Sequence, residues 1–523
     1  MDNHAITHFE HDSYNGTEQT TPGSHEQMAK AFDNIIKLLQ PIDFEKLTNR
    51  RRFEEFLLFW RDHIHKKVEN PDYVPEYEQD DMMGDNSGPE AALSTEGAEE
   101  KPKVKKEQYK VIAVELLKIA AREAGTPITS QAGEPHLFIW SHWTKITREA
   151  FGHFLKCAMI ALDVDRIMAP DADFINKVRK QVEETTGVEL KGVSRNMINF
   201  NNGTLDIMPD GEVSFREHRP SDLLRYVLPY DYDHNAECSR FQRFLDEVIP
   251  EEEKQKNLAE FFGSCFSDVK HEKVMLLYGT GANGKSVILE IVTRLFGKDN
   301  IAHNTLEEIT NSLGYFRGSL MDCILNYSGE ISKKVNPDAL KKMASREPMN
   351  ARYVWGRPFV VKDYCRVAFN CNHFPEVSDN SEGYFRRFLI VHFARTIPKD
   401  KQNPRLPEEI AETDLPGIMN WVIAGLQRLL DHGGKFTYSQ SSEELLEEYR
   451  RFSNSVELFV EQLKTGDQRS FKGTEIYALY RDFCTTNELS RVSQKQFSTD
   501  LQRHGVRKVR RSDGVYYEID QAS

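Results

Sequence analysis

The stretch LLYGTGANGKSVILEI, residues 276–291, constrains the fold of this chain more than any other part of its 523 residues. An apolar run typical of a strand leads into a glycine-rich turn, and a second apolar run with helical spacing follows it. The turn satisfies the pattern GxxxxGK[ST] between Gly279 and Ser286. A strand, a glycine turn and a helix in this order predict an α/β sheet with a phosphate-binding loop at one edge.

Each residue type in this loop has a physical reason. Glycines allow consecutive backbone N–H groups to face one phosphate, and the start of the following helix adds a partial positive charge. We expect Lys285 to reach the β- and γ-phosphates of ATP and the Ser286 hydroxyl to bind Mg²⁺. The predicted nucleotide-binding residues are Gly279, Thr280, Gly281, Ala282, Asn283, Gly284, Lys285 and Ser286.

Three further features follow the loop in order. The strand-like run in MDCILNYSGEIS ends in Glu330, a carboxylate suited to polarise an attacking water beside Mg²⁺. RVAFNCNHFP ends a third apolar run with Asn372, whose amide could sense the γ-phosphate or hold that water. Arg386 and Arg387 stand immediately before a fourth run, FLIVHF. The absence of NKxD-like and DxxG motifs disfavours a GTPase.

The net charge of −14 conceals two regions of opposite charge. Residues 69–107 contain twelve acids and four bases, whereas residues 491–511 contain seven bases and one acid. The overall value therefore does not exclude a nucleic-acid partner. Seven cysteines form no CxxC pair and no zinc-type cluster with histidine. Without a membrane-length apolar run or a secretory leader, we expect a cytoplasmic protein with no membrane partner.

Composition and periodicity divide the chain into six segments. Apolar strand candidates alternate with helices from about 255 to 396, which predicts a mostly parallel sheet covered by helices. Helical periodicity dominates residues 108–186, and NNG and PDG punctuate a hairpin region at 196–217. We predict a disordered tail (1–26), a helical segment plus acidic linker (27–106), a helical and hairpin module (107–254), an ATPase domain (255–400), a helical connector (401–440) and a C-terminal domain (441–523).

The phosphate loop, Glu330, Asn372 and the arginine pair in this order resemble the superfamily 3 helicases, specifically the phage, plasmid and poxvirus primase-helicase family. INFNNGTLDI and LPYDYDHNAECSRFQRFLDEV look like the module that precedes the ATPase in that family. The resemblance implies an α/β, AAA+-like P-loop ATPase core with a helical N-terminal collar, a hexameric ring and a place in the cytoplasm of a bacterial host. It assigns Asn372 to the sensor, Glu330 to water activation and Arg386 or Arg387 to a neighbour's ATP. Gly329 departs from the family, where an acid or serine often precedes the glutamate.

The resemblance also implies DNA contacts. In the segment LKKMASREPMNARYVWGRPF and just after it, the candidates are Lys341, Lys342, Arg352, Arg357 and Lys362. A solvated helix face is the alternative for the two lysines. The tail itself reads as three helices and a hairpin, which is the order of a winged helix. KQFSTDLQRHG would be the recognition helix and VRKVRRSDGVYYEI the wing, which suits duplex DNA, although a protein-docking winged helix remains open. The candidates in the wing are Arg507, Lys508, Arg510 and Arg511.

These features predict an ATP-driven, ring-forming replicative DNA helicase of a mobile genetic element or phage that translocates on single strands. Largely helical residues 1–250 without cysteine ligands predict no primase domain, so a separate primase or polymerase is an expected partner. One alternative is an origin-binding initiator or remodelling AAA+-like ATPase without processive unwinding. Another is a DNA-binding adaptor with negligible ATP turnover, against which Glu330 and the paired Arg386 and Arg387 argue.

Overall fold

The computed structural model describes residues 22–42, 50–70, 108–165, 167–331, 335–353, 356–375, 381–465, 470–487, 489 and 491–519. These residues form two compact units. Unit 1 runs to Lys191 and includes His218–Tyr226, and unit 2 comprises Gly192–Glu217 and the chain from Val227 onward. Among the described helices, none combines the length and the hydrophobicity that a membrane span requires. Residues 1–21 of the predicted tail, and residues 71–107 with the predicted acidic linker, lie outside the described ranges.

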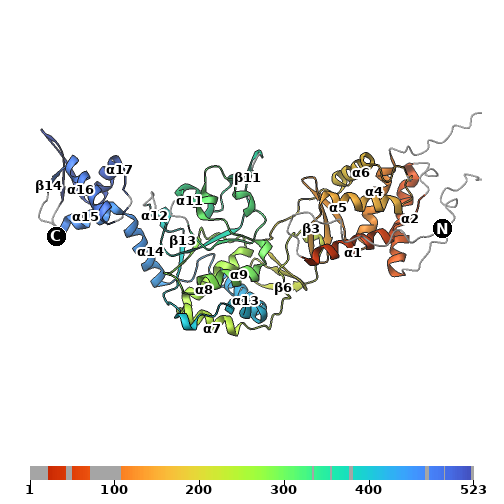
Figure 1. Cartoon of the computed structure of the whole chain (residues 1–523), viewed down its shortest axis with the longest axis horizontal. Coiled ribbons are helices and arrows are strands. Elements are labelled where there is room, and N and C mark those ends of the chain that lie inside the picture. The colour runs from red at the N-terminus through yellow and green to blue at the C-terminus, as the bar shows by residue number, and fades with distance from the viewer. Residues whose placement is uncertain are drawn as a thin grey trace, which may run out of the picture. The chain divides into compact units, whose positions relative to one another are not determined.

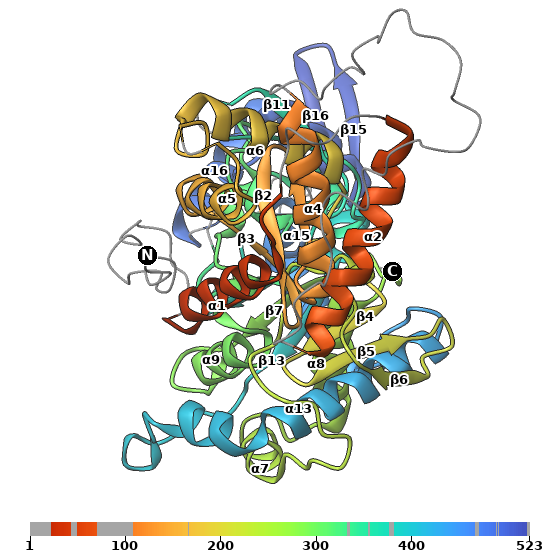
Figure 2. The ribbon, with the colours of Figure 1, turned by 90° about the vertical axis from the view of Figure 1, so that its right-hand side faces the viewer.

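Helices dominate unit 1, as its apolar spacing predicts. The helix α4 (Tyr109–Glu123) lies beside α2 (Arg50–Glu69), as Figure 2 shows. The helix α1 (Pro22–Leu38) begins five residues inside the predicted disordered tail, and a proline suits its first turn because no N–H is needed there. Phe32 and Phe154 stack at 4.2 Å in the core between the helices. The other α-helices that the structure describes in unit 1 are α5 (Arg148–Ala161) and α6 (Ala172–Thr186).

The prediction that helical periodicity dominates residues 108–186 is wrong between α4 and α5. An antiparallel sheet of β1 (Ile128–Gln131), β2 (Glu134–Ile139) and β3 (His142–Lys145) occupies this stretch. Its two tight turns are Ala132-Gly133 and Trp140-Ser141, neither of which is a strong hairpin signal. Strands of four to six residues are too short to reveal their period next to long helices.

Unit 2 begins with a second small antiparallel sheet, β4 (Met197–Phe200), β5 (Gly203–Ile207) and β6 (Val213–Arg216). The NNG signal is confirmed as a hairpin turn, because Phe200 pairs with Gly203. The PDG signal lies in the connection between β5 and β6. The helix α7 (Ser239–Val248) follows these strands, at the end of the segment LPYDYDHNAECSRFQRFLDEV.

The central sheet of unit 2 has five parallel strands, and this confirms the predicted α/β class. Figure 1 labels one of them, β13. The carboxyl ends of the strands meet at one edge, the carboxyl edge, and their amino ends at the other, the amino edge. Tyr278 pairs with both Cys371 and His392. The order is β13 (Phe388–His392), β7 (Val274–Tyr278), β12 (Arg366–Cys371), β9 (Leu325–Ser328) and β8 (Ile301–Ala302).

Helices cover both faces of this sheet. Figure 1 shows α8 (Glu252–Gly263), α9 (Lys285–Phe296) and α13 (Leu406–Asp431) together on one side and α11 (Pro337–Ala344) on the other. The segment predicted as a connector, 401–440, contains α13, which packs tightly against α8 and α9. The shorter elements are α10 (Leu306–Thr310), α12 (Glu382–Phe385) and the hairpin β10 (Met349–Arg352) with β11 (Pro358–Val361).

The C-terminal region has one helix more than the three predicted, and an additional short strand. Leu446 and Tyr449 of α14 (Gln440–Ser453) belong to the core of the central sheet, whereas a separate core begins at Val456. In that second core the sheet order is β14-β16-β15. Its elements are α15 (Ser455–Thr465), β14 (Ser470–Lys472), α16 (Gly473–Thr486), α17 (Gln494–Arg503), β15 (Val506–Arg511) and β16 (Gly514–Ile519).

Candidate functional site

The glycine-rich loop 279–286 joins β7 to α9 at the carboxyl edge, in the predicted strand, turn and helix context. A Cβ at Gly279 would lie 2.1 Å from Asn283 Nδ2 and 2.7 Å from the Phe393 carbonyl oxygen, so only glycine fits there. Gly281 and Gly284 have φ of 113° and 91°, which side chains rarely tolerate. The glycine pattern is therefore required by the path of the backbone, which supports the predicted cradle.

Lys285 begins α9 and is only 6% exposed. Its Nζ donates hydrogen bonds to the Gly279 carbonyl at 2.6 Å and to Asn283 Oδ1 at 2.9 Å. Burial lowers the pKa of this lysine. The ammonium thus lies inside the loop, held by two acceptors that an incoming phosphate could replace. Thr280, Ala282 and Ser286 are exposed along the same loop.

Glu330 and Asn372 follow the carboxyl ends of β9 and β12, at the same edge as the loop. Both side chains are exposed. The Ser328 hydroxyl donates to the Glu330 carbonyl oxygen at 3.0 Å, which shapes the turn after β9. The backbone N–H of Gly279 donates to Cys371 O at 3.1 Å, so the start of the loop contacts the residue before Asn372. The parallel topology therefore brings all three predicted elements to one edge.

Arg386 and Arg387 precede β13 and lie at the amino edge, away from the phosphate loop. The Arg386 side chain is 61% exposed and its Nη2 lies 3.6 Å from Glu272. Arg387 is only 12% exposed, and its guanidinium donates to Gly383 O and, at 3.3 Å, to Ser345 Oγ. The two adjacent arginines thus differ: Arg387 is held inside its own subunit and Arg386 faces outward.

An aromatic stack that the sequence analysis did not foresee connects the carboxyl edge with α14. The Phe374 ring lies between Tyr278 at 4.4 Å and Tyr449 at 4.3 Å, with interplanar angles of 10° and 20°. The Tyr449 hydroxyl also donates to Pro375 O at 2.9 Å. Only the spacing of Phe374 two residues after Asn372 could have drawn attention to it.

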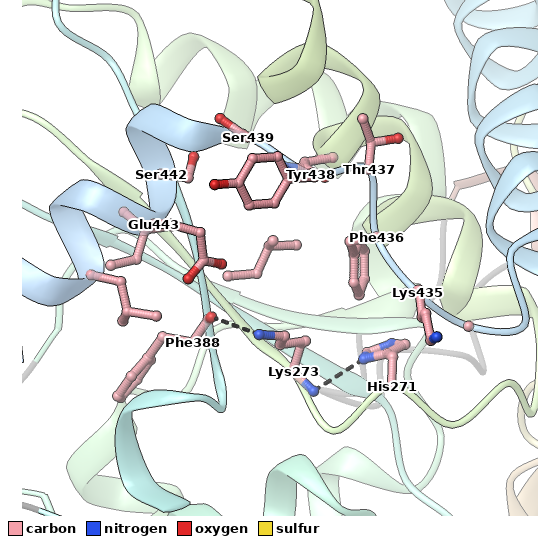
Figure 3. A pocket seen from close by; sticks show the side chains of 15 residues that line it. His271, Lys273, Phe388, Lys435, Phe436, Thr437, Tyr438, Ser439, Ser442 and Glu443 are labelled. Atoms are coloured by element: carbon pink, nitrogen blue, oxygen red, sulfur yellow. Dashed lines mark hydrogen bonds between the residues drawn. The ribbon is translucent and has the colours of Figure 1, made fainter. Parts of the chain in front are cut away.

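A cavity of about 270 Å³ opens near the amino edge, beside β13 and the start of α14. Figure 3 shows Lys273 beside this cavity, with Glu443 across from it. Lys273 Nζ donates to the carbonyl oxygens of Arg386 at 2.7 Å and Phe388 at 3.3 Å. Burial lowers the pKa of Lys273, and the Glu443 carboxylate partly offsets this effect. Sequence reasoning missed Lys273 because a lysine before an apolar strand is an ordinary surface residue.

The basic residues predicted near 340–362 lie on α11 and on the hairpin of β10 and β11. Lys341 lies 4.0 Å from Asp338, which partly supports the alternative of a solvated helix face, whereas Lys342 is exposed. Arg352 Nε donates to Gly356 O at 3.1 Å. Arg357 and Lys362 are exposed at the two ends of β11.

The four tail candidates lie on β15, and two of them are paired. Glu518 of β16 lies 2.6 Å from Arg507 and 2.8 Å from Arg511. Lys508 lies over the Tyr517 ring at 5.9 Å and donates to Ser498 Oγ of α17 at 3.3 Å. Arg510 is exposed and, within the described ranges, has no carboxylate within ion-pair distance.

Two protein-family models match separate parts of the chain. The family described as "Family of unknown function (DUF5906)" matches residues 277–387, which include the phosphate loop, Glu330 and both arginines. The family described as "D5 N terminal like" matches residues 133–250. Neither match covers half of the chain.

Two viral proteins share sequence similarity with the chain. "Putative helicase L207/L206" of Acanthamoeba polyphaga mimivirus is 21% identical over 252 residues, which is 45% of this chain and 25% of that protein. "Putative helicase 184R" of Invertebrate iridescent virus 6 is 22% identical over 261 residues, 44% of this chain and 26% of that protein. The chain thus spans about a quarter of the length of these curated relatives.

A solved structure, the A form apo structure of the NrS-1 C-terminal region, aligns with 77% of this chain and 98% of its own, with a TM-score of 0.45 and 9% identity. This similarity is too low to support a conclusion about a shared fold.

Proposed function

Since the chain is related to the phage and viral primase-helicases, we propose that it is an ATP-driven DNA helicase that works as a ring and translocates on single strands. The ring would be a hexamer built on an AAA+-like, superfamily 3 P-loop core. The protein would act in the cytosol of the host of a phage or mobile element, together with a separate primase or polymerase.

The observation that carries this proposal is the shared carboxyl edge of β7, β9 and β12, at which the phosphate loop, Glu330 and Asn372 all lie. In the proposal, loop 279–286 binds the phosphates of ATP and Lys285 exchanges its two acceptors in the loop for phosphate oxygens. Glu330 accepts a proton from the attacking water, and Asn372 senses the γ-phosphate.

The residues at this edge also fit Mg²⁺. The Ser286 hydroxyl and the Glu330 carboxylate are exposed oxygen ligands of the kind that this cation prefers, beside a cradle that a side chain at Gly279 would fill. A bound Mg²⁺ would neutralise charge on the phosphate oxygens. We propose that Ser286 and Glu330 would hold this ion.

The position of Arg386 supports action between subunits. The strand β7 has five residues, so the amino edge lies roughly 13 Å from the phosphate loop along the sheet. An arginine at the amino edge is therefore directed away from the ATP of its own subunit. We propose that Arg386, the more exposed of the two, is the finger that stabilises charge on a neighbour's γ-phosphate, and that Arg387 braces it.

For DNA we propose two surfaces. The first would bind the phosphates of a single strand, independently of base sequence, through the basic residues of α11 and the β10–β11 hairpin. These are Lys342, Arg352, Arg357 and Lys362, with Lys341 at their margin. The domain that begins at Ser455 would bind duplex DNA as a winged helix, since its order of helices, short strand and hairpin fits one. In that domain α17 would enter the major groove, and Arg507, Lys508, Arg510 and Arg511 would contact flanking phosphates.

The first test is ATP hydrolysis with and without single-stranded DNA. We expect Lys285→Ala to lose ATP affinity and Glu330→Gln to retain bound ATP while turnover falls at least about a hundredfold, the scale of a lost general base. Normal hydrolysis by Glu330→Gln would contradict the catalytic assignment.

Strand displacement on forked DNA separates a helicase from the alternative of an initiator or remodelling ATPase. The wild-type protein should release the labelled strand with ATP, and Glu330→Gln should not. ATP hydrolysis without displacement on any fork polarity would favour the alternative.

Mixing variants tests the ring. Lys285→Ala and Arg386→Ala should each be inactive alone, and a mixture should recover part of the activity because some interfaces pair an intact loop with an intact finger. Subunit exchange is verified by energy transfer between labelled subunits. If subunits exchange and neither Arg386→Ala nor Arg387→Ala recovers activity when mixed with Lys285→Ala, the ring mechanism fails.

A further inference from the structure

Lys273 holds the backbone on both sides of Arg387. It lies one residue before β7, and its Nζ donates to the carbonyl oxygens of Arg386 at 2.7 Å and Phe388 at 3.3 Å, the second of which is drawn in Figure 3. The carbonyl between them, that of Arg387, accepts instead from the backbone N–H of Val274 at 2.7 Å. Three consecutive carbonyls are thus fixed by two neighbouring residues.

These contacts satisfy two carbonyl groups with which β7 does not pair. Along a parallel strand, successive residues direct their hydrogen-bonding groups alternately to one side and the other. Because β7 pairs with Arg387, the carbonyls of Arg386 and Phe388 point away from it, and β13 is the outermost strand on that side. The Lys273 ammonium supplies the donors that a further strand would otherwise provide.

Glu272 acts on the side chains of the same segment. Its Oε2 lies 3.6 Å from Arg386 Nη2 and 3.8 Å from Arg387 Nη2. Glu272 has φ of 51°, a left-handed conformation that residues with a side chain rarely adopt. Two adjacent residues therefore contact one segment in different ways. Glu272 contacts the guanidinium groups of Arg386 and Arg387, and the Lys273 ammonium contacts the backbone carbonyls on either side of Arg387.

We propose that Lys273 is a positioning residue for Arg386: it clamps the backbone of residues 386–388 so that the exposed guanidinium is presented to the neighbouring subunit at a fixed point. This inference rests on the proposed role of Arg386 as a finger. A finger acts only within hydrogen-bond distance of the transferring phosphoryl group, and small misplacements of catalytic groups cost up to about a hundredfold in rate.

The test replaces the ammonium with an apolar group of similar length, Lys273→Met. The cavity beside Lys273 gives the new side chain room, so the fold should persist. We expect kcat for ATP to fall between about 10-fold and 100-fold with KM nearly unchanged, because the phosphate loop is untouched. The matched control is Lys270→Met, an exposed lysine three residues earlier, which should behave as the wild type.

Mixing experiments then assign the defect to a side of the interface. Lys273→Met mixed with Lys285→Ala should recover activity, since some interfaces have an intact loop and an intact finger. Lys273→Met mixed with Arg386→Ala should not, because every finger is then impaired. General destabilisation by Lys273→Met would not produce this pattern.

The outcomes distinguish the two proposals. If Arg386→Ala itself fails to complement Lys285→Ala, the proposed finger is wrong. If Arg386→Ala complements but Lys273→Met keeps the wild-type kcat, or does not recover with Lys285→Ala, the positioning role is overturned. Should Lys273→Met not fold, Lys273→Gln, a shorter neutral donor, must give the same pattern for the inference to stand.

Discussion

At the scale of single residues, burial gives similar side chains different roles. Lys285 and Lys273 are both lysines whose pKa is lowered by burial, yet one lies inside the phosphate loop and the other holds a strand at the opposite edge. Arg386 and Arg387 are neighbours in the chain, and only one is exposed. Residue type alone therefore does not assign function in this protein.

His142 should make the stability of unit 1 depend on pH. Desolvation first, and the charge of His218 second, lower the pKa of His142 to about 4 from 6.5. Between these values the unfolded chain binds a proton that the folded chain does not, so stability should fall as pH drops below 6.5, by roughly 2 kcal/mol at pH 5. Hydrogen exchange of the β2 and β3 amides in the full chain measures this.

The control for this prediction removes the titrating group. His142→Gln should flatten the dependence of exchange on pH in unit 1, after correction for intrinsic exchange rates. His432→Gln, at an exposed histidine in unit 2, should leave it unchanged. An equal slope in His142→Gln would contradict the assignment.

At the scale of elements, close helix packing and the ion pairs of the β15–β16 hairpin determine the effects of substitutions. In α13 a Cβ at Gly425 would lie 2.4 Å from the Ala259 carbonyl carbon and 2.6 Å from its side chain. Helices α8 and α13 can approach this closely only because residue 425 has no side chain. On β15, Arg507 and Arg511 each pair with Glu518, and Arg511 also lies over the Tyr516 ring, whereas Arg510 has no such pair within the described ranges.

Gly425→Ala should destabilise unit 2 by about 1–3 kcal/mol, because the helices must separate to accommodate a methyl group. The matched control is Gly152→Ala in α5, where a Cβ would meet nothing within 4 Å. That substitution should be neutral or stabilise unit 1 by up to about 1 kcal/mol through helix propensity. Urea unfolding of the two variants measures both effects, and equal destabilisation would refute the packing argument.

Arg510 should contribute more to duplex DNA affinity than Arg507. Arg510 is unpaired within the described ranges, whereas Arg507 lies 2.6 Å from Glu518 and must break that contact to bind a phosphate. We expect Arg510→Ala to reduce the slope of log affinity against log salt by about 1, and Arg507→Ala to reduce it less. Fluorescence anisotropy at several salt concentrations compares them, and a larger effect of Arg507→Ala would count against the proposed phosphate contact.

At the scale of the whole molecule, the core around the central sheet extends further along the chain than composition indicated. The predicted C-terminal domain begins at residue 441, but Leu446 and Tyr449 of α14 pack into the core of the central sheet. The second core starts at Val456. A truncation must therefore spare α14.

Deletion of residues 455–523 should leave basal ATP hydrolysis intact while duplex DNA binding weakens and loses much of its salt dependence. Deletion of 441–523 should also destabilise unit 2, because it removes two buried side chains and the Phe374 stack. Thermal unfolding, hydrolysis and duplex binding of the two truncated proteins test this. Unchanged duplex affinity in the shorter deletion would favour a protein-docking role for the tail.

Most of the central sheet could be predicted from the sequence because its strands are buried on both faces and read as apolar runs. The runs VMLLY, CILNY, RVAFN and FLIVHF all contribute strands, with β9 shifted slightly toward Glu330. The candidate site could be assembled because its residues follow these strands directly. The sheet β1-β2-β3 could not, because its strands are short and its turns carry weak signals.

Local chemistry can thus be recognised in the sequence. The glycine loop, the acid and amide after their strands, and the arginine pair are each specified by a few adjacent residues. Contacts between distant segments cannot be recognised from the sequence in this way. That Arg386 is exposed and Arg387 buried, that Lys273 reaches the carbonyls of residues more than a hundred positions away, and that Phe374 stacks between Tyr278 and Tyr449 depend on strand order and helix docking. Many side chains packing together decide that arrangement, and no short stretch contains it.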